Sequence, residues 1–116
     1  MEEIIQENLF DDKYKFKLDN FEGPLDLLLH LIKEAKMDIA DVKLADITEQ
    51  YLDYMQGLDE LDMERATEFI TVAATLIEIK SKSLLPRPEE NLPDEVDEEK
   101  LLLERLKEYQ IFKEAS

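Results

Sequence analysis

Few side chains in this sequence have a type and spacing that could support catalysis. His30 is the only histidine, and Asp26 lies four residues before it, on the same side of the segment if that segment is helical. A histidine oriented by a carboxylate can act as a base, but acyl transfer also requires a nucleophile within its reach. The sequence has no glycine-rich phosphate-binding loop and no nucleophile-elbow motif. We therefore interpret His30 and Asp26 as a surface ion pair and expect no catalytic residue and no cofactor.

Two runs of carboxylates, at residues 59–62 and 94–99, are the other candidates for a ligand site. Neither run has the ligand spacing or the central glycine of a calcium-binding EF-hand loop. The sequence contains no cysteine, which excludes thiolate metal sites, disulfides and a cysteine nucleophile. We therefore expect no metal site and interpret both runs as charged segments that face solvent.

The net charge restricts the partners that the chain can bind. With 30 acidic and 14 basic residues, the chain carries a formal charge of −16. Such a surface repels other anions, and phosphate contacts need clustered lysine and arginine. Direct binding to DNA, RNA or an anionic membrane is therefore not expected. An acidic inhibitor that mimics DNA stays open as an alternative, although the carboxylates do not form the regular array that mimicry of phosphates would need.

Length and composition predict one small, mainly α domain in a cytoplasmic protein. The 116 residues are 44% apolar, with two glycines and four prolines, and helix-forming residue types dominate. The N-terminal segment is acidic and lacks the apolar stretch of a signal peptide. The longest apolar cluster, residues 27–32, is too short to span a bilayer and includes His30.

The segments before the first helix differ in pattern from the rest of the chain. Residues 1–12 are interpreted as a flexible acidic tail. Tyr14–Leu18 alternates apolar and charged residues, which predicts a short strand or an extended arm that needs a partner. A helical domain of three helices is then expected within residues 13–85.

Capping signals and apolar spacing set the expected helices. Three are predicted over 24–36, 44–56 and 62–85. Gly23 and Pro24 suit the start of the first helix, and Gly57 suits a left-handed cap after the second. An acidic, proline-rich linker follows over 86–96, and a fourth helix is expected over 97–116, within a chain that we expect to continue.

The helix over 62–85 is the most informative element. Its apolar side chains cover roughly 220° of the helical wheel, whereas a helix that lies on one core needs little more than about 100°. The wide apolar arc divides into two seams with coiled-coil spacing. One seam is Met63, Ala66, Ile70, Ala73, Ile77, Lys80 and Leu84, and the other is Phe69, Val72, Leu76, Ile79 and Ser83.

Two short helices can cover only one seam and part of the second. An apolar patch left exposed in this way marks an interaction site, and the natural partner of a heptad-spaced stripe is another helix. The alternative is that the fourth helix folds back over the second seam and completes a four-helix bundle.

Three motifs in this order resemble those of the segregation and condensation protein A family, the bacterial kleisins. Phe21–Ile32 resembles the opening motif of the family, Asp46–Leu52 the second and Ala66–Pro86 the third. The likeness runs from about Tyr14 to the end of the sequence.

The resemblance implies a non-catalytic adaptor with protein partners. Members of this family bridge the two heads of an SMC dimer, the ATPase that organises bacterial chromosomes. Their N-terminal domain packs on the neck coiled coil of one SMC subunit, and their central segment binds a dimer of ScpB. The third helix would then dock on the SMC neck, and residues 97–116 would begin the ScpB-binding segment.

The resemblance and the seams together give candidate contact residues. For the SMC neck we predict Phe69, Val72, Leu76 and Ile79, and for ScpB we predict Leu102, Leu106 and Tyr109. The alternative for the SMC neck is that Ile70, Ile77 and Leu84 face the partner while the other seam is internal. An exposed seam would also allow weak self-association.

Overall fold

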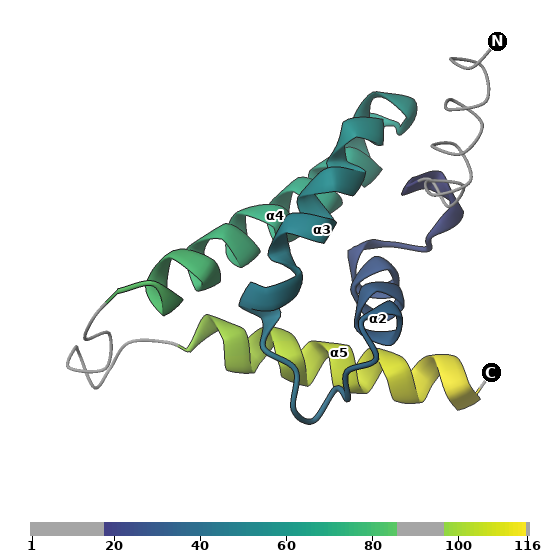
Figure 1. Cartoon of the computed structure of the whole chain (residues 1–116). Coiled ribbons are helices and arrows are strands. Elements are labelled where there is room, and N and C mark those ends of the chain that lie inside the picture. Colours follow the sequence, from purple (N-terminus) through teal and green to yellow (C-terminus); the bar gives the residue numbers. More distant parts are fainter. Residues whose placement is uncertain (1–17, 86–96, 116) are drawn as a thin grey trace, which may run out of the picture.

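The computed structural model describes residues 18–85 and 97–115, and every regular element in these two ranges is helical (Figure 1). The α-helices are α2 (Pro24–Glu34), α3 (Thr48–Tyr54), α4 (Met63–Ser83) and α5 (Glu98–Ala115). Short 3-10 helices cover Leu18–Asn20, Leu44–Ile47 and Met55–Glu60. The predicted mainly α fold is therefore confirmed.

Several predicted segments fall outside the described residues. These are the tail over 1–12, the linker over 86–96 and the arm over 14–18, apart from its last residue. That residue, Leu18, begins a 3-10 helix, is buried in the core and accepts a backbone hydrogen bond from Phe21 N at 3.1 Å. The described end of the predicted arm is therefore a helical turn.

Helix α2 starts as the sequence predicts, with Gly23 as its N-cap and Pro24 as its first residue. It ends two residues earlier than expected, because Lys36 adopts a left-handed conformation with φ of 59°. Lys36 N then donates to Lys33 O, and Met37 N donates to Ile32 O at 3.1 Å, the two bonds of a Schellman cap. A non-glycine residue in this conformation costs about 1 kcal/mol, which the two bonds offset.

The predicted second helix is divided into three parts. A 3-10 helix over Leu44–Ile47 turns both of its terminal side chains inward, because residues three apart share a face in this tight helix. Helix α3 follows, and Tyr51 at its centre donates its hydroxyl to the carbonyl O of Phe69 at 2.9 Å. The prediction of a left-handed cap at Gly57 is wrong, since this residue lies inside the 3-10 helix Met55–Glu60 and has no positive φ.

Helix α4 is the longest described element and supplies one wall of the core. It begins at Met63, and the side chain of Asp62 caps it by accepting a hydrogen bond from Arg65 N at 2.8 Å. Its inner face packs against α3 and the Leu44–Ile47 turn, with α2 and α5 adding to the same core. The five buried residues on this face are Phe69, Val72, Ala73, Leu76 and Ile79.

Helix α5 folds back onto the domain and crosses close to α2 in the view of Figure 1. Its contacts with α2 and α4 bury Leu102 and Leu106 in the same core that α4 lines. The carboxylate of Glu99 also accepts a hydrogen bond from the backbone N–H of Leu44 at 2.9 Å. The fourth helix therefore folds back onto the domain, as in the alternative given for it above.

The burial of α5 predicts unequal effects of one substitution at two of its leucines. Leu106→Ala should destabilise the domain by about 2–5 kcal/mol, because it leaves a cavity in a closed core. Leu101→Ala should cost only about 0.5 kcal/mol or less, because that side chain is half exposed on the outer side of the helix. Urea unfolding followed by circular dichroism measures both; equal, small losses would contradict the packing of α5.

Candidate partner-docking face

The structure decides which seam of α4 is internal. Phe69, Val72, Leu76 and Ile79 all lie in the core of this chain. In this chain the four side chains that we predicted for the SMC neck hold α4 against the other helices, and they are not available on the described surface. The other apolar side of the helix, which was the alternative, is the one that reaches solvent.

Four large apolar side chains form a stripe along the outer side of α4. Met63 is 82% exposed, Ile70 50%, Ile77 48% and Leu84 73%. They recur every seven residues, a repeat that drifts only about 20° around a straight helix per step. The stripe extends over the whole helix, and an apolar surface of this kind is typical of a protein–protein contact.

The small residues of the exposed seam differ from those expected. Ala73 is buried and Ala66 is half-buried, so the side of the helix that carries them turns toward the core. Thr67, Ala74 and Ser81 instead lie between the four large residues, and all three are exposed. We call the exposed face the α4 seam: Met63, Thr67, Ile70, Ala74, Ile77, Ser81 and Leu84.

The predicted ScpB-contact residues also turn out to be internal. Leu102 and Leu106 are buried, and Tyr109 is half-buried against the core. Leu102 and Leu106 cannot meet a partner while α5 stays in this position, because they are enclosed where α5 packs on α2 and α4, whereas Tyr109 is partly exposed. The large exposed apolar side chains of α5 are Leu101, Ile111 and Phe112.

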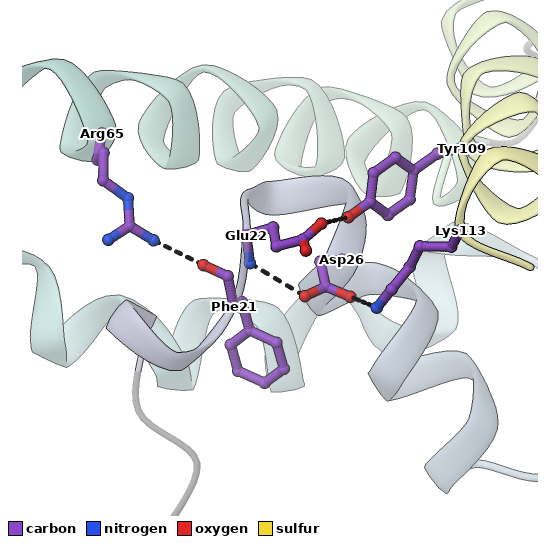
Figure 2. A network of polar contacts seen from close by, with 6 residues as sticks. All are labelled: Phe21, Glu22, Asp26, Arg65, Tyr109 and Lys113. Carbon is purple, nitrogen blue, oxygen red and sulfur yellow. Dashed lines mark hydrogen bonds and ion pairs between the residues drawn. The ribbon is translucent and has the colours of Figure 1, made fainter. Parts of the chain in front are cut away.

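A turn over residues 21–26 ties α4 and α5 to the start of α2 (Figure 2). Arg65 of α4 donates from Nη2 to the carbonyl O of Phe21 at 2.6 Å. Tyr109 of α5 donates its hydroxyl to Oε1 of Glu22 at 2.5 Å. Sequence reasoning missed this cluster, because Tyr109 and Glu22 are 87 residues apart and no local pattern relates them.

Asp26 is the second acceptor in this turn. One carboxylate oxygen accepts the backbone N–H of Glu22 at 3.0 Å, and the other accepts the ammonium of Lys113 from α5 (Figure 2). The predicted pair of Asp26 and His30 is therefore not the arrangement adopted. His30 Nε2 lies 3.3 Å from a carboxylate oxygen of Glu34, one turn further along α2.

Both α5 donors in the turn keep their protons at neutral pH. Burial, followed by the hydrogen bond to Glu22, raises the pKa of the Tyr109 hydroxyl well above its ordinary value. The hydrogen bond to Asp26 raises the pKa of Lys113: it outweighs desolvation, which lowers this pKa, and the charges of Asp26 and Glu22 add to the increase. The contacts between α5 and this turn are therefore present across the neutral range.

Two kinds of feature, metal-binding clusters and membrane-spanning helices, are not found in the described ranges. Among residues 18–85 and 97–115, no group of three or more histidine, aspartate or glutamate side chains could hold a metal ion. The same residues contain no helix long and apolar enough to cross a membrane. The exposed apolar stripe makes the α4 seam the candidate functional face of the described domain.

Comparison with known proteins agrees with the three sequence motifs. The model of the family described as segregation and condensation protein ScpA matches residues 31–116. The chain belongs to this family. The resemblance inferred from the sequence is thereby confirmed, and the family is one of segregation and condensation proteins.

Curated relatives extend the match toward the N-terminus. The segregation and condensation protein A of Clostridium perfringens strain SM101 is 55% identical over 101 residues, which are 86% of this chain and 41% of that protein. The protein of the same name from Clostridium acetobutylicum is 54% identical over 101 residues, covering 85% and 41%. The one from Brevibacillus brevis is 50% identical over 108 residues, covering 86% and 42%. The chain thus spans about two-fifths of the length of these ScpA proteins.

The geometry of the 21–26 turn predicts that Asp26 contributes more to stability than its ion pair with Lys113 alone would. Asp26→Ala should destabilise the domain by about 1–3 kcal/mol, because it removes acceptors for both the Glu22 N–H and Lys113. Lys113→Ala should cost about 0.5 kcal/mol, since that pair is partly exposed. Urea unfolding measures both, with Asp19→Ala as a control that removes an exposed carboxylate. An Asp26→Ala loss no larger than the control would show that the turn does not hold α5.

Proposed function

We propose that this chain is the SMC-docking part of a kleisin subunit in a bacterial SMC–ScpA–ScpB complex. It acts without catalysis, in the cytoplasm, and supports chromosome condensation and segregation. The α4 seam binds the neck coiled coil of the SMC ATPase. The observation that carries the proposal is the exposed heptad stripe of Met63, Ile70, Ile77 and Leu84 on a helix whose opposite side is fixed in a core.

The dimensions and chemistry of the seam fit a helical partner. From Met63 to Leu84 the stripe spans three heptads, which is about 32 Å along a helix axis. Over three heptads the stripe drifts by only about 60° around a straight helix, so it stays on one side, and a coiled coil, which has the same seven-residue repeat, can follow it along its whole length. Burying the four side chains would remove apolar surface from water, which favours association.

The charge of the chain argues for protein contacts over direct DNA contacts. At −16, the chain is repelled by phosphate, so DNA would be handled by other parts of the complex. The alternative of an acidic DNA mimic leaves the α4 seam without a use, because mimicry relies on carboxylates and not on exposed isoleucines. Competition with DNA for a basic partner would separate the two functions.

The proposed contact with ScpB has a structural condition. Leu102, Leu106 and Tyr109 were predicted for this contact and are packed within the domain. We propose that ScpB binds these three residues of α5 only when α5 separates from α2 and α4. Binding would then carry the cost of opening the core, and it should be weaker for this chain than for an isolated α5 peptide that is helical.

The docking proposal predicts the effect of one charge in the seam. Ile77→Glu should weaken binding to an SMC head fragment with its neck coiled coil by on the order of 100-fold, because the contact would bury an unpaired carboxylate. The domain should stay folded, since Ile77 is about half exposed. Calorimetric titration measures affinity, and light scattering of the mixture gives the stoichiometry, expected to be one to one.

Ile111→Glu is the matched control for that experiment. It places the same substitution at an isoleucine that is 67% exposed on α5, outside the seam, and it changes the net charge equally. Unaltered affinity in this variant is expected. Wild-type binding by Ile77→Glu, or an equal loss in both variants, would overturn the assignment of the α4 seam as the docking face.

A further inference from the structure

The α4 seam alternates large and small side chains in a regular order. Its residues follow one another at steps of four and three, with the large ones first: Met63, Ile70, Ile77 and Leu84 alternate with Thr67, Ala74 and Ser81. In coiled-coil terms, one of the two core layers is bulky and the other is nearly empty. The surface is therefore a row of ridges separated by shallow gaps.

The gaps constrain what can pack on them. Protein interfaces are packed about as densely as protein interiors, and an unfilled gap loses contact energy on both of its walls. A helix that lies on the seam must therefore place large side chains opposite Thr67, Ala74 and Ser81. Covering Thr67 leaves no unsatisfied hydroxyl, because its Oγ1 already donates to the Met63 carbonyl at 2.8 Å.

One border of the seam is acidic. Glu64 and Glu78 each follow a large seam residue directly, so they occupy the flanking positions that form salt bridges between coiled-coil helices. Both are exposed. On the other border Lys80 is paired with Glu49 of α3 at 2.8 Å, which leaves little positive charge on that side.

Resting on the proposed function, we infer the pattern of the partner surface. It is an α-helical coiled-coil surface that presents large apolar side chains to the gaps at Thr67, Ala74 and Ser81. It carries lysine or arginine beside them, opposite Glu64 and Glu78. A second copy of this chain is a poor occupant, because it would add another −16 charge and could set acidic borders against each other.

The gap at Ala74 gives the first test. Ala74→Leu should lower affinity for the SMC head–neck fragment by on the order of tenfold or more, mainly through faster dissociation, because the added side chain fills the gap that the partner needs. Circular dichroism and urea unfolding should match the wild type, since Ala74 is exposed on the side away from the core. Ala115→Leu, at an exposed alanine of α5, is the control.

The acidic border gives the second test. In stopped-flow binding at low salt, the double variant Glu64→Lys, Glu78→Lys should associate on the order of tenfold more slowly, and its rate should depend less on salt. Glu104→Lys, Glu108→Lys reverses two exposed charges on α5 and gives the same net charge. It should keep most of the wild-type rate.

The outcomes separate this inference from the docking proposal. If Ile77→Glu abolishes binding while Ala74→Leu binds like the wild type, the seam docks a partner but the partner does not fill the gaps. If both charge-reversal variants slow association equally, only net charge matters and the basic border is wrong. Concentration-dependent dimerisation in sedimentation, lost in Ile77→Glu, would show that a second copy is the occupant and would overturn the inference.

Discussion

The packing of one side of α4 is the constraint on which the rest of the domain depends. Phe69 and Leu76 are fully enclosed, and Tyr51, the Leu44–Ile47 turn and Leu106 of α5 all belong to the core that they form. The hydroxyl of Tyr51 bonds to the Phe69 carbonyl, so α3 is held to this side by a polar contact as well as by apolar ones. Because this side is fixed in the core, the rotation of α4 about its axis is set, and the apolar stripe on the opposite side faces solvent.

Contacts of the 21–26 turn hold α2, α4 and α5 in position relative to one another. The turn is short, and three side chains from other helices bind it. Arg65 donates a hydrogen bond to the Phe21 carbonyl, Tyr109 donates one to Glu22, and Lys113 pairs with Asp26. Each contact is partly exposed and modest in energy, but together they relate three helices that are distant in sequence. A docking seam on α4 needs such support, because a helix that rotated by one residue position would turn isoleucines inward and lose the stripe.

Local rules predicted the elements of this fold better than their contacts. The Gly23–Pro24 start of α2 could be predicted because the start of a helix depends on a few neighbouring residues. The left-handed conformation of Lys36 could not, since lysine has no local preference for it, and the backbone hydrogen bonds from Lys36 N to Lys33 O and from Met37 N to Ile32 O stabilise it. The two seams were visible as periodicity, but which one is internal depends on where α3 and α5 lie, and periodicity carries no information about that. Leu102 and Leu106 were assigned to a partner for the same reason: the sequence does not show where α5 lies.

The position of α5 links the two proposed contacts of this chain through one core. Leu102 and Leu106 share that core with the inner side of α4, and Glu99 accepts the N–H of Leu44 in the turn that packs on α4. A partner that separates α5 from the core would break these contacts and weaken the packing that supports the α4 seam. A partner that rigidifies α4 would in turn increase the free-energy cost of separating α5. By linkage, any such effect of one partner on the affinity of the other must be reciprocal and equal in free energy. The shared core therefore favours negative coupling between a partner bound to the α4 seam and one bound to the inner stripe of α5.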